Sequence, residues 1–189
     1  MKKLITVFGP SDCTAQSALY QSAERLGTLL AEAGFGVVTG GYEGVMEAVS
    51  KGARSAGAGV IGITAEVYYN RGREANEFVT KQINVKSAVD RLMELLDLAD
   101  AFVACGISTG TLVEVATAWD YQIKGFINPK PIYLFGEGWE KTCQVLFAEH
   151  SFKGKENIVK PVDSPEEVVG ELLDQFGKQQ MLPDLNIIL

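Results

Sequence analysis

Three short apolar segments of this chain each end in a glycine-containing turn and are followed by residues with a helical repeat. The segments are Leu4–Phe8, Phe35–Thr39 and Ala101–Cys105, and the turns after them are 9–11, 40–44 and 106–111. An apolar run of about five residues that stops at glycine predicts a buried strand. Because such strands alternate with helices, the pattern predicts a parallel sheet with helices on both faces. This arrangement is the α/β class of the doubly wound, Rossmann-like type, with a mainly parallel sheet.

The same alternation predicts the remaining elements. Further strands are expected at 60–64, 78–83, 131–135 and 157–160, and helices at 15–33, 45–56, 85–98, from the turn at 106–111 to about 124, and at 139–147. Ser164-Pro165-Glu166-Glu167 has the N-cap serine and first-turn proline that open a helix. Residues 65–76 show no periodicity and are expected to form a long loop near a site. We predict a single nucleotide-binding domain over 1–189 with a C-terminal tail of about 178–189, whose apolar end packs on the body or on a partner subunit.

Composition narrows the classes of function. The chain has 189 residues, 47% of them hydrophobic, and a formal net charge of −7 from 17 basic and 24 acidic residues. This charge argues against a general nucleic-acid or membrane-surface binder, so neither partner is expected. No apolar run approaches the roughly 20 residues that span a bilayer, and no signal peptide is evident. Three widely spaced cysteines and one histidine, His150, do not fit the usual zinc patterns, so we predict no metal site and reduced thiols in the cytoplasm.

The glycine turns are the expected ligand site. In an open parallel sheet, ligands bind at the carboxyl ends of the strands where the strand order reverses, so the three turns should converge there. The first backbone N–H groups of a helix are free to bind a phosphate, and hydroxyl side chains after the third turn add donors. We predict phosphate or nucleotide binding by Gly9, Ser11, Gly40, Gly41, Gly44, Ser108, Thr109, Gly110 and Thr111. Glu114 would repel a phosphate, so it must point elsewhere or act beside it.

With these motifs in view, the chain resembles the LOG ("Lonely guy") family, also labelled possible lysine decarboxylase. Gly40-Gly41-Tyr42-Glu43-Gly44-Val45-Met46 is similar to the family's Gly-Gly turn and Gly-Leu-Met helix start. Arg91, before the strand entry Ala99-Asp100-Ala101-Phe102, is similar to the family's arginine, and Gly110-Thr111-Leu112-Val113-Glu114 keeps half of its Pro-Gly-Gly-x-Gly-Thr-x-x-Glu motif. The resemblance covers residues 4 to about 148.

The resemblance implies an activity: hydrolysis of the N-glycosidic bond of a nucleoside 5′-monophosphate, with Arg91 and Glu114 as the catalytic pair and a homodimer as the assembly. Bond cleavage builds positive charge on the ribose, which a carboxylate can stabilise while it orients water. No resident cofactor is expected, because nothing indicates the pyridoxal-phosphate site that a lysine decarboxylase needs.

The chain also departs from the LOG motif. Gly106-Ile107-Ser108 stands where the family has Pro-Gly-Gly, Leu92 where it usually has lysine, and Glu47 where it commonly has glycine. Related branches with altered glycine motifs include molybdenum-cofactor carriers, which bind without hydrolysis. A non-catalytic protein that holds a nucleotide or the molybdenum cofactor in the same cleft is therefore the alternative to the hydrolase.

Several other residues have both a functional and a plain structural interpretation. Cys105 ends a strand beside the predicted site, but no histidine is near it in sequence, which favours a buried, inert thiol. Trp119 and Tyr121 are expected in core or dimer packing, and His150 at the surface or a helix end. Arg71 and Arg73 either close over a ligand or are solvated loop residues, and the second interpretation is favoured.

Overall fold

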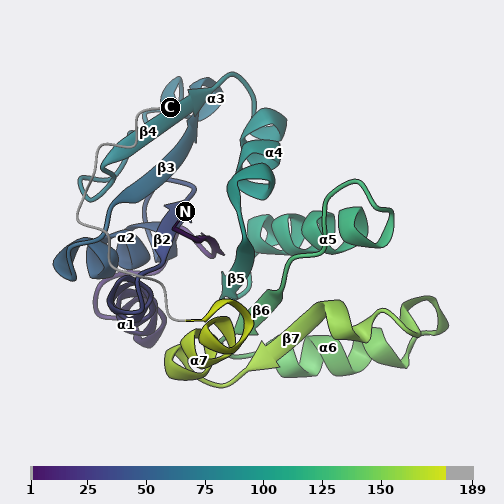
Figure 1. Ribbon diagram of the computed structural model, residues 1–189. Coiled ribbons are helices and arrows are strands. Elements are labelled where there is room, and N and C mark those ends of the chain that lie inside the picture. The colour runs from purple at the N-terminus through teal and green to yellow at the C-terminus, as the bar shows by residue number, and fades with distance from the viewer. Residues whose placement is uncertain (1, 178–189) are drawn as a thin grey trace.

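The computed structural model describes residues 2–177, which form alternating strands and helices (Figure 1). The elements are β1 (Leu4–Phe8), α1 (Ala18–Glu32), β2 (Gly36–Thr39), α2 (Val45–Ser55), β3 (Val60–Ala65), α3 (Glu66–Tyr69), β4 (Lys81–Val85), α4 (Ala88–Leu98), β5 (Ala101–Cys105), α5 (Thr109–Ile123), β6 (Ile132–Phe135), α6 (Trp139–Ala148), β7 (Val159–Val162) and α7 (Pro165–Phe176). Two short 3₁₀ helices, His150–Phe152 and Glu156–Ile158, precede β7.

The strands form one sheet in the order β4-β3-β2-β1-β5-β6-β7, and every strand pair is parallel. Val7 of β1 lies opposite Thr39 of β2 on one side and Val103 of β5 on the other. The chain winds outward in one direction from β1 to β4 and in the other from β5 to β7, so the order reverses between β1 and β5. The predicted doubly wound α/β fold is confirmed.

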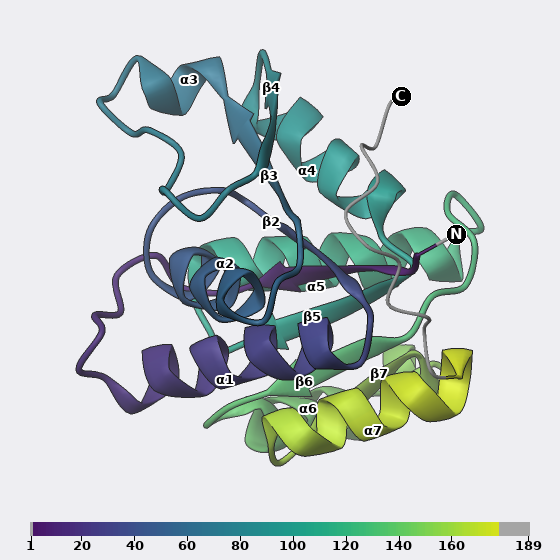
Figure 2. The ribbon, with the colours of Figure 1, turned by 60° about the vertical axis from the view of Figure 1, so that its left-hand side comes forward.

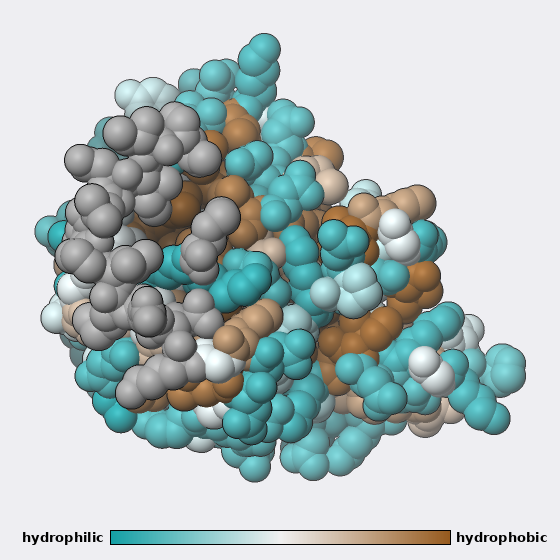
Figure 3. All heavy atoms as spheres, in the orientation of Figure 1, coloured by the Kyte–Doolittle hydropathy of each residue, from teal (hydrophilic) through white to brown (hydrophobic). Residues whose placement is uncertain are grey.

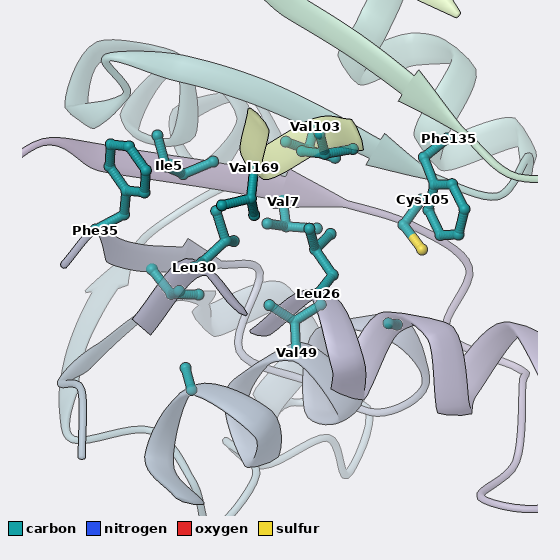
Figure 4. Packing of buried hydrophobic residues seen from close by; sticks show 14 of the residues in the cluster. Ile5, Val7, Leu26, Leu30, Phe35, Val49, Val103, Cys105, Phe135 and Val169 are labelled. Carbon is teal, nitrogen blue, oxygen red and sulfur yellow. The ribbon is translucent and has the colours of Figure 1, made fainter. Parts of the chain in front are cut away.

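Two apolar cores cover the two faces of the sheet. Side chains of α1, α2 and α7 pack on one face, where Leu26 and Leu30 of α1 meet Ile5, Val7 and their neighbours (Figure 4). Side chains of α4, α5 and α6 pack on the other face, around the stacked rings of Phe8 and Phe102. Figure 2 shows α1 and α7 in front of the sheet and α5 behind it. The near-continuous burial of the central strands follows from this double cover.

Serine N-caps fix the first residue of four helices. The side chains of Ser17, Ser87, Ser108 and Ser164 each accept a hydrogen bond from the backbone N–H three residues on, at the starts of α1, α4, α5 and α7. The N-cap position that the sequence predicted for Ser164 is confirmed. The helices expected from 15 and from 85 begin three residues later because Ser17 and Ser87 are their caps.

Three local assignments differ from those expected. The loop expected at 65–76 contains a single helical turn, α3, directly after β3. β4 begins at Lys81 rather than at 78, because Val79 packs over Gly62 and strand pairing starts only after it. β7 begins at Val159 because Glu156–Ile158 forms a 3₁₀ turn. The apolar end of the tail lies outside the described residues. Within 2–177, every helix is too short or too polar to cross a bilayer.

Candidate functional site

A cavity of about 330 Å³ lies at the carboxyl ends of β1 and β5, where the strand order reverses, and is named the switch-point cavity here. This is the position that open parallel sheets use for ligands. The turns after β1, β2 and β5 all contribute to it, as expected. Its lining is Gly9, Ser11, Asp12, Tyr42, Met46, Tyr68, Arg73, Arg91, Ser108, Thr109, Gly110, Thr111 and Glu114.

The first turn of α5, Ser108 to Thr111, lines this cavity. Ser108 Oγ accepts a hydrogen bond from the Thr111 N–H at 3.2 Å and lies 2.8 Å from Thr111 Oγ1. The N–H groups of Thr109 and Gly110 have no acceptor within the helix, because they belong to its first turn. Both residues line the cavity. The turn therefore offers two amide donors and the positive end of a helix dipole to an anion.

The altered segment Gly106-Ile107-Ser108 leaves the amide turn open. Gly106 has φ = +78°, a conformation that suits glycine, and its carbonyl accepts a hydrogen bond from Trp139 Nε1 at 3.2 Å. Ile107 packs into the apolar core on the α4–α6 side and faces Gly138, so it is not part of the cavity lining.

Arg91 extends from α4 to the ends of two strands. Its Nε donates to the Ile63 carbonyl at 2.8 Å and its Nη2 to the Gly40 carbonyl at 2.9 Å. The guanidinium carbon lies 5.3 Å from the ring centre of Tyr42 and 5.7 Å from that of Tyr68. Two carbonyls and two aromatic rings thus hold one nearly buried cation in a fixed place.

Glu114 faces Arg91 from the second turn of α5. Its Oε1 is 4.0 Å from Arg91 Nη1, and the side chains of Arg91 and Glu114 are only 11% and 17% exposed. Burial raises the pKa of Glu114 to about 7, and the charge of Arg91 opposes that rise. A carboxyl group that titrates near neutral pH can give or take a proton under ordinary conditions.

The predicted glycines have different places. Gly9 lines the cavity, and a Cβ there would overlap Val45 and the Cys105 carbonyl. Gly40 holds Arg91 through its carbonyl. Gly41 and Gly44 have positive φ and shape the turn before α2, with Gly44 packed against Pro10 and Ser11. Gly40, Gly41 and Gly44 are not part of the cavity lining.

Some lining residues had no clear signal in the sequence. Arg73 lines the cavity and lies 3.8 Å from Glu43 through its Nη1, although a solvated role was the favoured interpretation. Tyr68 comes from the aperiodic region that was expected near a site, and Asp12 carried no motif. Met46 belongs to the glycine-turn motif but was not predicted to line the site. Asp12 is exposed at the mouth of the cavity. For the part of the cavity that Tyr68 and Arg73 line, the sequence signal was a Tyr-Tyr pair followed by two arginines in an aperiodic segment.

The remaining candidates lie in packing or at the surface. Cys105 is fully buried, and burial raises the pKa of its thiol well above the ordinary range, so it is not nucleophilic. Trp119 is in the core and donates to the Lys155 carbonyl, Tyr121 packs on Phe126, and His150 is exposed. Within residues 2–177, no group of three or more His, Cys, Asp or Glu side chains is placed to hold a metal ion.

The sheet order and the cavity define the class: a doubly wound α/β protein with a cavity at its switch point, beside the start of α5. The chain belongs to the SLOG cluster4 family, whose model matches residues 2–169. The broad relationship that the glycine and glutamate motifs indicated is therefore confirmed, at a coarser level than LOG itself.

Solved structures and a sequence relative extend the comparison. The molybdenum cofactor binding protein of the phototrophic bacterium Rippkaea orientalis is 32% identical, over 93% of this chain and 97% of that chain, with a TM-score of 0.74. The molybdenum cofactor carrier protein of Chlamydomonas reinhardtii is 25% identical, over 94% and 100% of the two chains, with a TM-score of 0.73. An uncharacterised protein of Archaeoglobus fulgidus is 32% identical over 114 residues, which cover 60% of this chain and 72% of the relative.

Proposed function

We propose that the protein binds a phosphorylated small molecule in the switch-point cavity without turning it over, and that the molybdenum cofactor is the leading candidate. The observation that carries this proposal is the amide turn of Thr109 and Gly110, which opens into a cavity of ligand size. The chain is similar over nearly its whole length to proteins described as binding or carrying that cofactor.

The charges around the cavity support an anionic ligand. Arg91 is fixed by two carbonyls, and Arg73 lies on the wall that is formed by the segment after α3. Glu114 would oppose a phosphate if it were charged, but its pKa near 7 allows it to take up a proton as the anion enters. A bound dianion would raise this pKa further, so binding is expected to be accompanied by proton uptake.

The test uses the full chain expressed in a bacterium that makes the molybdenum cofactor. After purification and denaturation, the released pterin is oxidised and quantified by its fluorescence, with molybdenum measured in the same sample. Near-stoichiometric pterin is expected from the wild type, and much less from Thr109→Pro, which removes one amide donor of the turn. Absence of pterin from a wild-type protein that binds nucleotides instead would contradict the cofactor proposal.

A second candidate function has one specific observation in its favour: the Arg91–Glu114 pair beside the amide turn. A nucleoside 5′-monophosphate whose phosphate rests on Thr109 and Gly110 would have its sugar close to a carboxyl group of pKa about 7. Such a group can stabilise an oxocarbenium-like ribose and activate water, which would release free base and ribose 5-phosphate.

The hydrolase is tested by incubation with AMP, GMP, CMP and UMP, with free base measured by chromatography. Base release that is lost in Glu114→Gln, while binding is kept, would favour the hydrolase over the carrier. If the wild type and Glu114→Gln both bind a nucleotide and neither releases free base, the hydrolase hypothesis is wrong.

Three further properties belong to the same proposal. A homodimer is expected from the LOG resemblance, and exposed apolar side chains on α4 and α5 (Val89, Leu112, Val113 and Ile123) offer a surface for it. Apolar side chains reach the surface over these helices in Figure 3. All three cysteines are unpaired, which fits the reducing cytoplasm. Absence of a nucleic-acid partner stays a prediction from the net charge.

A further inference from the structure

A second cavity, of about 380 Å³, lies beside the switch-point cavity at the carboxyl ends of β3 and β4 and is named the edge cavity here. Its lining is Tyr42, Thr64, Tyr69, Arg73, Glu74, Ala75, Gln82 and Asn84. Tyr42 and Arg73 belong to the walls of both cavities, so the two cavities adjoin one another. None of the predicted phosphate-binding residues lines the edge cavity.

One threonine orients two amide side chains in this cavity. Gln82 Nε2 donates to Thr64 Oγ1 at 2.7 Å, and Thr64 Oγ1 donates to Asn84 Oδ1 at 3.1 Å. A hydroxyl has a single proton, so one amide must donate to it while the other accepts from it. Gln82 Oε1 and Asn84 Nδ2 are thereby left as an acceptor and a donor, and neither has a partner within the described part of the chain.

The polar side chains of Glu74, Gln82 and Asn84 form a pattern of hydrogen-bond donors and acceptors in this cavity. Gln82 and Asn84 are two residues apart on β4 and share one face of this edge strand. Glu74 adds a carboxylate to the same lining. The cavity therefore offers acceptors from Glu74 and Gln82 and a donor from Asn84. The edge of a 2-amino-4-oxopyrimidine ring has the complementary groups: an amino group and a ring N–H that donate, and a carbonyl that accepts.

Aromatic side chains flank these groups. Tyr42 is buried, and its hydroxyl accepts from the Ala65 N–H at 3.0 Å, so its ring is fixed. Tyr69 on α3 is 64% exposed and lines the cavity, which leaves its ring free to stack on a flat heterocycle. Stacking of a base on an aromatic ring is favourable for any base, so the selectivity must come from the polar edge.

We infer that the edge cavity recognises the 2-amino-4-oxopyrimidine ring of a guanine or a pterin through Glu74, Gln82 and Asn84, with Thr64 as their positioning residue. This inference rests on the proposed function, in which a ligand's phosphate lies on the amide turn and its ring reaches the adjoining edge cavity. Adenine presents only one donor beside one acceptor on its pairing edge, so it leaves Glu74 without a pair of N–H partners.

The experiment separates the ring from the phosphate. The ¹⁵N-labelled full chain is titrated with guanosine, adenosine and pterin, none of which carries phosphate, and separately with inorganic phosphate. Guanosine, pterin or both should shift the side-chain NH₂ signals of Asn84 and Gln82, whereas that of Asn157, which lies in the 3₁₀ turn before β7, stays in place. Adenosine should bind at least about tenfold more weakly, since it lacks a charge-assisted pair of hydrogen bonds.

Two variants and one control complete the test. Glu74→Gln and Asn84→Asp should each weaken guanosine or pterin binding about tenfold. Glu77→Gln, an exposed position on the same segment outside the cavity lining, should leave it unchanged. Response to guanosine alone indicates a guanine nucleotide as the source of the ring, and response to pterin alone indicates a pterin cofactor.

Equal binding of adenosine, no response to either ring, or unchanged affinity in Glu74→Gln would overturn the edge-cavity inference. Inorganic phosphate is expected to shift the backbone amides of Thr109 and Gly110. If phosphate leaves these two amides unshifted, the proposed phosphate site is wrong. The ring site is tested independently, because guanosine and pterin carry no phosphate.

Discussion

At the scale of single residues, the nearly buried pair Arg91 and Glu114 decides what the cavity can do. The arginine is held by the carbonyls of Ile63 and Gly40, whereas the contact of the glutamate within residues 2–177 is the 4.0 Å approach to Arg91. Desolvation therefore dominates at the glutamate, and its pKa rises from 4.5 to about 7. This pair therefore combines a permanent cation with a carboxyl group whose charge varies with pH.

Replacement of Glu114 by glutamine is expected to change how stability depends on pH. Because the folded-state pKa is raised, the folded protein binds the proton more tightly than the unfolded chain does. The stability from this group is fully present below pH 4.5 and is lost as the pH rises through 7. Relative to the wild type, Glu114→Gln should therefore gain about 3 kcal/mol in free energy of unfolding between pH 4.5 and pH 8.

Urea denaturation of both proteins at several pH values measures this difference. Glu77→Gln, at an exposed position, serves as the control and should follow the wild type. Parallel stability curves for wild type and Glu114→Gln would show that Arg91 cancels the effect of burial.

Gly40 is the second decisive residue, because Arg91 needs the space that its missing side chain leaves. A Cβ at Gly40 would overlap the guanidinium of Arg91. Gly40→Ala is expected to displace the arginine, to lower the free energy of unfolding by about 1–3 kcal/mol, and to weaken ligand binding. Gly170→Ala in α7 meets no atom within 4 Å and should instead stabilise by roughly 0.5–1 kcal/mol. Thermal unfolding and ligand titration of the two variants provide the check; normal binding by Gly40→Ala would contradict the assigned place of Arg91.

At the scale of elements, the start of α5 combines a structural cap with a binding surface. Ser108 and Ser164 are N-caps with nearly equal geometry, since each accepts from the N–H three residues on at 3.2 Å and 3.1 Å. Only Ser108 lines the switch-point cavity. Comparing variants of the two serines therefore distinguishes an effect on helix stability from an effect on ligand binding.

Ser108→Ala and Ser164→Ala should each reduce the free energy of unfolding by about 1 kcal/mol. Phosphate affinity should fall only in Ser108→Ala, because that helix start faces the cavity. Chemical denaturation together with phosphate titration distinguishes the effects. Equal affinity in both variants would place the anion elsewhere.

At the scale of the whole molecule, the reversal of strand order brings segments from distant parts of the chain to one site. Turns after β1, β2 and β5 meet there, and helices α4 and α5 supply its charged pair. The same two helices carry exposed apolar side chains, so the surface next to the site is also the surface on which a second copy is expected to pack.

The homodimer prediction is tested at Val113, which is 56% exposed on α5. Val113→Arg should shift the protein from dimer to monomer in light scattering after size exclusion, because a charge would be buried at the interface. Val145→Arg on α6, at a position 68% exposed, is the control and should stay dimeric. A monomeric wild type would contradict the expectation.

Much of the fold was predictable from local patterns. Apolar runs that stop at glycine, helical periodicity and the Ser164-Pro165 cap depend on interactions between residues close in sequence, so the sequence indicated the sheet class and most elements. The edge strand β4 was misplaced because its exposed alternating residues carry little apolar signal. The candidate site was partly predictable because Ser108 to Thr111 lie in the turn and helix start after β5, whereas Arg73 lacks any local motif.

The sequence by itself determined a doubly wound α/β domain with an amide turn at the start of α5, since short-range preferences and burial patterns are sufficient for both. Only the tertiary structure decided that Arg91 lies against Gly40 and Glu114, that Ile107 packs away from the cavity, and that Thr64, Gln82 and Asn84 form a second, adjoining pocket. Most of these contacts join residues far apart in the chain, and they depend on the strand order, which local patterns do not encode.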